Sequence, residues 1–282
     1  MSSRTLITGG SGFLGTHLRR IFNGDDLSRR SGLDILSADD VALVAEYDVV
    51  IHLAARLDKS PDSAEEVFRT NVEGTVNVLK HVRPDAVFIF ASTKDVYGRF
   101  ADNFAQVPED CPTLYSGQSP LEWSKLIAER YVEYYAHRKR FKSCIFRMST
   151  IVASNSEGNV PNFVGNFADA INQGVPLILP GSGRAIRDLL YVDDLADACQ
   201  AFVDSVIRHG LYNIGGGLSN ALSINEMVEK LEEVSGLQAV LSEDRSAPEP
   251  VPNRYVTDLD RVSQELGWAP KTRLEEAFKT LF

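Results

Sequence analysis

Apolar and polar positions alternate regularly through the first half of the chain. Short apolar runs of the kind that form buried strands occupy residues 4–8, 48–53, 86–91 and 143–148, and a weaker run occupies 26–28. Apolar residues spaced three or four apart predict helices at 12–22, 64–81 and 121–137. Because strands that alternate with helices are typical of α/β proteins, we predict a doubly wound parallel sheet.

The pattern becomes less regular after residue 150. We expect helices at 163–173 and 223–235, a strand followed by a helix at 189–203, and a further strand at 211–214. A chain of 282 residues is long enough for one large and one smaller domain. The predicted large domain covers about residues 1–150 and is completed by about 185–215. The predicted smaller domain is formed by residues 151–184 and 216–282.

Composition and charge narrow the classes of ligand. The formal net charge is −10 and the acidic residues are spread along the sequence, which argues against nucleic-acid or anionic-membrane binding. The three cysteines form no CxxC pair, and neither a signal pattern nor a membrane-length apolar run is present. We therefore expect a cytoplasmic protein without a metal site.

A glycine-rich segment lies between the first predicted strand and the first predicted helix. Such glycines allow a tight turn, let backbone N–H groups approach a pyrophosphate, and let the helix pack on the strand. The helix N-terminus then favours the negative charge of the ligand. We predict that this loop binds a dinucleotide through Gly9, Gly10, Ser11, Gly12, Phe13, Leu14 and Gly15.

The end of the second strand should decide between NAD and NADP. A carboxylate there accepts hydrogen bonds from the adenosine ribose, whereas arginines suit a 2′-phosphate. If the strand ends at Ser28, then Arg29 and Arg30 favour NADP; if it ends earlier, Asp26 favours NAD. Both remain open, and we expect NADP slightly more than NAD.

Several further motifs occur in a fixed order along the chain. They are HLAA at 52–55, NVEGT at 71–75, STKDVYG at 92–98, RDLLYVDD at 187–194, YNIGGG at 212–217 and LGWAP at 266–270. With the glycine loop, they resemble the extended short-chain dehydrogenase/reductase family, specifically its NAD-dependent epimerase/dehydratase branch. The resemblance spans nearly the whole chain. It implies a Rossmann-type dinucleotide-binding domain, a smaller substrate-binding domain, and hydride exchange between a nicotinamide and a nucleotide-linked sugar.

The resemblance also implies roles for individual residues. Thr93 matches the hydroxyl that contacts the reacting oxygen, and Lys125 matches the lysine that binds the nicotinamide ribose. Further cofactor contacts are implied at Ser28, Arg29, Arg30, Asp34, Ile35, Leu53, Ala54, Ala55, Arg56, Asn71, Ala91 and Ser92. Substrate contacts are implied at Thr93, Asn162, Arg187 and Arg245.

The catalytic tyrosine of the family is replaced in this chain. The tyrosine position, four residues before Lys125, is occupied by Leu121, which has no proton to exchange. We consider Tyr115, Asp95, Lys94 or a water beside Lys125 as the replacement. Lys94 and Asp95 stand where dehydratases of this branch carry an Asp-Glu pair, so standard dehydration is not expected.

Three functions follow from this pattern. The first is an NAD(P)-dependent epimerase or reductase of a nucleotide-linked sugar or deoxysugar, and the second is a dinucleotide-binding pseudoenzyme or sensor. The third is altered chemistry on a non-sugar substrate, which the changed strand at 149–153 favours. By analogy with the family, the helices at 64–81 and 121–137 could form a homodimer.

Overall fold

The computed structural model describes residues 3–154, 162–242, 247 and 249–282. The chain folds as two compact units. The first comprises Met1–Val96, Gln118–Arg147 and Ala196–Tyr212, and the second comprises Tyr97–Gly117, Met148–Leu195 and Asn213–Phe282. Segments 97–117 and 185–195, which the sequence pattern placed in the large domain, thus group with the second unit.

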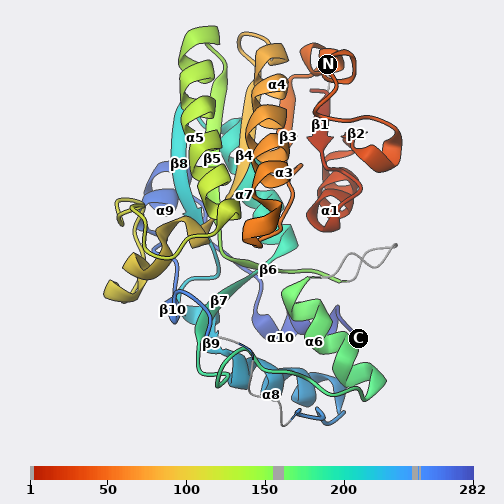
Figure 1. Cartoon of the computed structure of the whole chain (residues 1–282), viewed down its shortest axis with the longest axis vertical. Coiled ribbons are helices and arrows are strands. Elements are labelled where there is room, and N and C mark those ends of the chain that lie inside the picture. The colour runs from red at the N-terminus through yellow and green to blue at the C-terminus, as the bar shows by residue number, and fades with distance from the viewer. Residues whose placement is uncertain (1–2, 155–161, 243–246, 248) are drawn as a thin grey trace. The chain divides into compact units, whose positions relative to one another are not determined.

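A six-stranded sheet forms the centre of the first unit. Its strands are β1 (Thr5–Thr8), β2 (Asp25–Leu27), β3 (Val49–His52), β4 (Val87–Thr93), β5 (Lys142–Met148) and β8 (His209–Ile214), in the order β2-β1-β3-β4-β5-β8 (Figure 1). The strand β1 pairs in parallel with β2 and β3, and β3 pairs in parallel with β4. The predicted strands are present within a few residues of their expected bounds.

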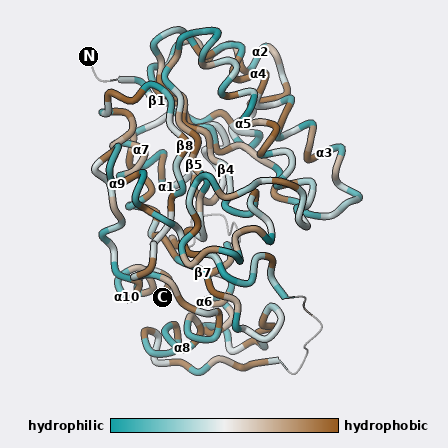
Figure 2. The backbone as a smooth tube through the Cα atoms, turned by 90° about the vertical axis from the view of Figure 1, so that its left-hand side faces the viewer, coloured by the Kyte–Doolittle hydropathy of each residue, from teal (hydrophilic) through white to brown (hydrophobic). Residues whose placement is uncertain are grey.

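Helices flank both faces of this sheet. They are α1 (Phe13–Phe22), α2 (Ala38–Val41), α3 (Ala64–Phe68), α4 (Gly74–His81), α5 (Pro120–Lys139) and α7 (Val192–Asp204). Figure 2 shows α1 and α7 on one side of the strands and α2, α4 and α5 on the other. The predicted helix at 64–81 is continuous but contains a π-helical turn at Arg69–Glu73. The doubly wound α/β prediction is confirmed.

The core on the α4 and α5 face explains why these segments pack together. Val50, Phe88 and Phe90 point from the sheet towards Val78 of α4 and Val132 of α5, and all five side chains are buried. Burial of apolar surface on this scale is the main driving force for docking the helices on the sheet. It holds the ends of β3 and β4 beside the start of α5.

The part of the second unit that the structure describes contains a smaller sheet flanked by α-helices. Its strands β6 (Thr150–Val152), β7 (Ile186–Tyr191) and β10 (Arg254–Tyr255) have the order β10-β7-β6, and β9 (Ala221–Ser223) pairs antiparallel with β7. Its helices are α6 (Phe163–Gln173), α8 (Ile224–Ser235), α9 (Asp260–Leu266) and α10 (Leu274–Lys279). The bounds predicted for α6 are confirmed. In the described part of the chain, no helix has the length and apolar character needed to cross a membrane.

Candidate functional site

The glycine loop connects β1 to α1 and has no room for larger side chains at two positions. Gly9 has φ of +71°, and a Cβ atom there would lie 2.9 Å from the backbone of Ala54. A Cβ atom at Gly15 would overlap the carbonyl group of Gly9. The N–H of Gly9 donates to the carbonyl of Leu27 (2.8 Å), and that of Gly12 donates to the carbonyl of Gly9 (2.9 Å). Only glycine at Gly9 and Gly15 allows this close approach.

The loop lies where the sheet order reverses. The chain passes from β1 to β2 on one side and then returns to β3 on the other. Ligands of open α/β sheets bind at such a switch point, outside the carboxyl ends of the strands. Gly12 is the N-cap residue of α1, and the first turn contains no acidic side chain, so the positive end of the helix dipole faces this crevice. The loop and helix therefore fit the pyrophosphate of a dinucleotide.

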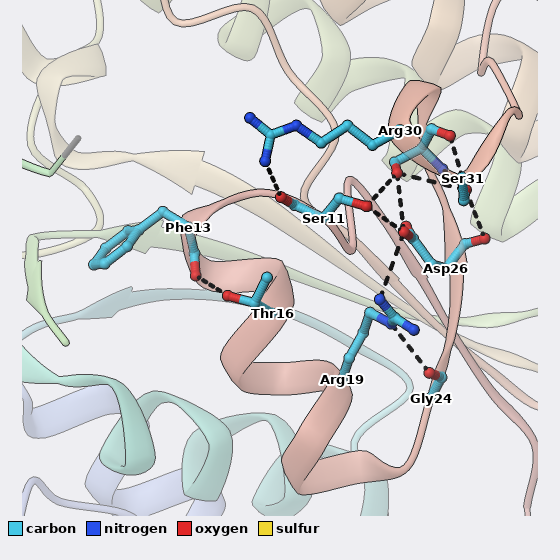
Figure 3. A network of polar contacts seen from close by, with 9 residues as sticks. Ser11, Phe13, Thr16, Arg19, Gly24, Asp26, Arg30 and Ser31 are labelled. Carbon is cyan, nitrogen blue, oxygen red and sulfur yellow. Dashed lines mark hydrogen bonds and ion pairs between the residues drawn. The ribbon is translucent and has the colours of Figure 1, made fainter. Parts of the chain in front are cut away.

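A polar network links the loop to the end of β2 (Figure 3). The Asp26 side chain is only 6% exposed and is paired with Arg19. Its Oδ2 accepts hydrogen bonds from Ser11 Oγ (2.5 Å) and Ser28 Oγ (3.0 Å). All these contacts involve Oδ2, whereas Oδ1 is buried and has no hydrogen-bond partner.

The arginines that follow β2 lie at the surface. The strand ends at Leu27, so Ser28 is the first residue after it, and a short 3-10 helix at Arg29–Ser31 follows. Arg29 and Arg30 are exposed, and Arg30 Nη1 donates to the carbonyl of Ser11 (3.2 Å). A guanidinium group therefore lies directly beside the glycine loop.

His52, the first residue of the HLAA motif, is the last residue of β3, and it is fully buried opposite Thr8 of β1. Its ring packs against those of Phe88 and Phe90 on the neighbouring strand β4. Thr75 Oγ1 donates to the Asn71 carbonyl (2.6 Å) and therefore accepts from His52 Nε2 (2.9 Å). His52 Nδ1 then accepts from Thr8 Oγ1 (2.7 Å). This chain of hydrogen bonds requires a neutral imidazole and positions the strand ends that carry the glycine loop.

The buried state of His52 predicts a loss of stability in acid. Burial, helped by the charge of Lys125, lowers the pKa of His52 to about 3. Since the unfolded chain takes up this proton near pH 6.5, the stabilisation is complete above that pH and is lost as the pH falls towards 3. We expect this residue alone to reduce the free energy of unfolding by about 3 kcal/mol between pH 7 and pH 4. Urea titrations of the wild type and of His52→Gln at pH 7 and pH 4 measure this change in the free energy of unfolding. An equal loss of stability in the two proteins would show that His52 is not its cause.

The remaining residues near the loop make contacts within the protein. Asn71 Oδ1 accepts from the N–H of Arg56 (2.7 Å), and Asn71 Nδ2 donates to Ser124 Oγ (2.8 Å). Asn71 thus ties the segment after β3, which includes Leu53, Ala54 and Ala55, to α5. Asp34 Oδ1 accepts from the N–H of Leu36 (2.9 Å), and the Ile35 side chain is buried.

The end of β4 presents a half-buried hydroxyl. Thr93 Oγ1 accepts from the N–H of Asp95 (3.2 Å). The preceding Ser92 is turned into the interior, where its Oγ donates to Glu129 Oε1 (2.5 Å). Glu129 also pairs with Arg147 (2.7 Å), and this ion pair is almost completely buried. The interior contact of Ser92 leaves Thr93 as the hydroxyl at the strand end.

The helix α5 places Leu121 and Lys125 one turn apart. Ser119 caps the helix, Glu122 completes a capping box and Pro120 occupies the first turn, which is a strong start signal. Leu121 is 6% exposed. Lys125 is 5% exposed, and its Nζ donates to the carbonyl of Ala91 (2.7 Å). Burial lowers the pKa of Lys125 to about 8, although Glu129 opposes the shift.

Four charged side chains meet beside Thr93. Lys94 Nζ pairs with one oxygen of Asp95 and Lys59 Nζ with the other (2.8 Å). Lys59 Nζ also binds Glu122 Oε1 (2.8 Å). Burial alone would raise the pKa of Asp95, but the ammonium groups of Lys94 and Lys59 outweigh it and hold that pKa well below its usual range. Sequence reasoning missed Lys59 and Glu122, and only the capping-box spacing at Ser119 could have drawn attention to Glu122.

The other predicted site residues belong to the second unit. Tyr115 is 70% exposed. Asn162 caps α6, where its Oδ1 accepts from the N–H of Gly165 (2.7 Å). The Arg187 guanidinium donates to the carbonyls of Ile186 (2.6 Å), Asn253 (3.3 Å) and Pro252 (2.7 Å). Arg245 lies outside the described residues.

Comparisons with known proteins agree with this arrangement. The chain is 26% identical to CDP-paratose 2-epimerase of Salmonella typhi, with 99% of this chain and 98% of the relative aligned. It is 29% identical to UDP-glucose 4-epimerase of Azospirillum brasilense, over 96% and 88% of the two chains. The solved structure of MoeE5 in complex with UDP-glucuronic acid and NAD superposes with a TM-score of 0.86 at 25% identity, over 98% and 97%.

The family model described as NAD dependent epimerase/dehydratase family matches residues 5–215. This range includes the glycine loop, the end of β4 and the start of α5. The chain therefore belongs to the NAD-dependent epimerase/dehydratase family, of the extended short-chain dehydrogenase/reductase type, and depends on NAD or NADP.

Proposed function

We propose that this protein is an epimerase or reductase that exchanges a hydride between NAD(P) and a nucleotide-linked sugar, through a site without the usual tyrosine. The observation that carries the proposal is the combination of the glycine loop, the Thr93 hydroxyl and the buried Lys125 within one unit. The nucleotide-sugar ligands and activities named for CDP-paratose 2-epimerase, UDP-glucose 4-epimerase and the MoeE5 complex support the substrate class.

Each residue has a distinct task in the proposed site. The backbone of the glycine loop binds the pyrophosphate, and the Lys125 ammonium binds the nicotinamide ribose. A bound nicotinamide supplies or accepts the hydride. The Thr93 hydroxyl orients the reacting oxygen of the sugar and stabilises charge on it. Because the Lys125 Nζ is buried, it binds without competition from bulk water.

The cofactor preference that we propose is for NADP. One oxygen of Asp26 is bonded to Ser11 and Ser28 and the other is buried, whereas Arg30 is exposed and its guanidinium lies beside the loop. We expect Arg30→Ala to weaken NADPH binding about tenfold and to change NADH binding little, because a charge-assisted phosphate contact contributes about 1.5–3 kcal/mol. Fluorescence titration measures both affinities, with Arg20→Ala, an exposed arginine on α1, as the control. Wild-type protein that binds NADH as tightly as NADPH would refute this preference.

The direct test of the function uses a panel of UDP-, dTDP-, GDP- and CDP-linked hexoses and their 4-keto-6-deoxy forms. The hexoses are incubated with NAD or NADP and the keto forms with NADPH. Nicotinamide absorbance is followed for reduction or oxidation, and the sugar products are separated by chromatography because an epimer has the same mass as its substrate. We expect turnover of at least one member. Cofactor binding without turnover of any member would instead support the pseudoenzyme function, which the loss of the phenol at Leu121 favours.

We further propose that the protein forms a homodimer through α3 and α5. Four exposed aromatic side chains lie on these helices, namely Phe68, Trp123, Tyr131 and Tyr134. Exposed aromatic residues clustered on neighbouring helices are typical of interfaces. Sedimentation equilibrium at about twice the chain mass of 31.1 kDa supports the dimer, and a monomer mass at micromolar concentration refutes it.

A further inference from the structure

Lys59, Lys94, Asp95 and Glu122, which we call the Lys94 cluster, connect three segments of the first unit. Lys59 follows β3, Lys94 and Asp95 follow β4, and Glu122 lies in the first turn of α5. Asp95 receives one ammonium group on each oxygen, and Lys59 extends the chain to Glu122. In sequence, Lys94 directly follows Thr93, and Glu122 directly follows Leu121.

Only some groups of this cluster can give a proton. The pKa of Asp95 lies well below its usual range because of the ammonium groups of Lys94 and Lys59, so its carboxyl group carries no proton at neutral pH. Lys59 is held between two carboxylates, and its side chain is 54% exposed. The Lys94 side chain is only 8% exposed, and this residue directly follows the hydroxyl that orients the substrate.

Lys125 is less suited to the same task. Its Nζ donates to the carbonyl of Ala91, two residues before the end of β4, and lies over the ring of Phe90. The proposed function already assigns its ammonium group to the nicotinamide ribose. Lys94 has no such role in the proposed function, and it directly follows Thr93, the last residue of β4.

We propose, on the basis of the proposed function above, that Lys94 donates the proton that the absent tyrosine would supply, and that the substrate is a nucleotide-linked keto sugar. The carbonyl carbon gains the hydride from the reduced nicotinamide, and the carbonyl π electrons move to the oxygen. That oxygen forms an O–H bond as the N–H bond of Lys94 breaks. The sugar is reduced, the nicotinamide is oxidised, and the neutral amine of Lys94 regains a proton from solvent.

The cluster also sets the protonation state in which Lys94 starts the reaction. Asp95 stabilises the ammonium form of Lys94, so the lysine starts a cycle with a proton to give, although the same ion pair makes it a weaker acid. Reduction of a carbonyl needs a proton donor, whereas oxidation of a hydroxyl needs a base. The arrangement therefore favours a reductase of keto sugars over an enzyme that starts by oxidising its substrate.

Lys94→Arg separates proton donation from charge. Arginine can keep the ion pair with Asp95, but its guanidinium group does not give up a proton in proteins. With dTDP-4-keto-6-deoxyglucose and UDP-4-keto-6-deoxyglucose as probes, we expect kcat for NADPH oxidation to fall about 100-fold, the scale of general acid catalysis. The NADPH dissociation constant should stay within about twofold of the wild type, because ground-state binding is not changed. Lys80→Arg, an exposed lysine on α4, is the matched control.

A second substitution tests whether the loss is a loss of the proton donor. Adding Leu121→Tyr to Lys94→Arg should raise kcat at least about tenfold above that of Lys94→Arg, since a phenol one turn before Lys125 can donate the proton instead. Lys94→Arg activity within about threefold of the wild type would overturn the inference, as would a parallel loss of NADPH affinity. A wild type that oxidises nucleotide sugars but reduces neither probe overturns the inference and leaves the proposed function intact. A wild type inactive on the whole panel refutes the proposed function, and the inference falls with it.

Discussion

Gly12→Asp is expected to abolish NADPH binding while the chain remains folded. Gly12 is the N-cap residue of α1 and has extended backbone angles, φ −83° and ψ 180°. Aspartate is among the preferred N-cap residues, so the substitution suits the helix, and its Cβ atom, 3.1 Å from the carbonyl oxygen of Gly9, requires only a small shift of the loop. Its carboxylate would however stand in the place proposed for the pyrophosphate. Two unit charges about 4 Å apart repel by about 4 kcal/mol at an effective dielectric constant of 20, which corresponds to a roughly thousandfold loss of affinity.

The measurement is fluorescence titration with NADPH, accompanied by thermal unfolding without cofactor. Ser223→Asp is a matched control, because Ser223 is the N-cap of α8 and the change adds the same charge at a helix start in the second unit. The control should bind NADPH like the wild type. Unchanged NADPH affinity in Gly12→Asp would refute the assignment of the glycine loop to the dinucleotide.

Leu121→Tyr is expected to raise the rate of hydride transfer on any accepted nucleotide sugar about tenfold. The capping box of α5 places this residue one helical turn before Lys125, whose Nζ is buried. A cation near a phenol favours the phenolate and lowers the phenol pKa, so that it can exchange a proton near neutral pH. The gain should be smaller than in the Lys94→Arg background, because Lys94 already serves the wild type.

Leu121→Phe distinguishes the effect of the phenol hydroxyl from the effect of the aromatic ring. Phenylalanine adds the same aromatic bulk at this buried position but carries no proton, so kcat should not rise above the wild type. The measurement is the single-turnover rate of nicotinamide absorbance change at saturating substrate. An equal rate for Leu121→Tyr and Leu121→Phe would show that a phenol here takes no part in the reaction.

The fold was largely predictable because its signals are local. The buried strands β1, β3 and β4 are short apolar runs, and α5 begins at a complete capping signal from Ser119 to Glu122. The grouping of segment 97–117 with the second unit was not predictable. It depends on long-range pairing, such as that of Val107 with Thr257, which no local pattern encodes.

The candidate site was predictable only where the sequence carries contiguous motifs. The glycine loop, Thr93 and Lys125 are evident from spacing, and Leu121 is evident as a departure from it. The Lys94 cluster is different, because Lys59 and Asp95 are 36 residues apart and meet only when β3 and β4 lie side by side. The buried state of Asp26 likewise depends on how the loop folds over β2, so the sequence alone left NAD and NADP open.

Hydride transfer to a nucleotide sugar is the central claim, and isotope transfer tests it most directly. The wild-type protein is incubated with dTDP-4-keto-6-deoxyglucose and NADPH deuterated at the transferable position of the nicotinamide, and the sugar product is examined by mass spectrometry. We expect deuterium to appear in the sugar, and we expect Lys94→Arg to slow its appearance. NADPH that binds but never transfers deuterium to this sugar or to any other member of the panel would contradict the account.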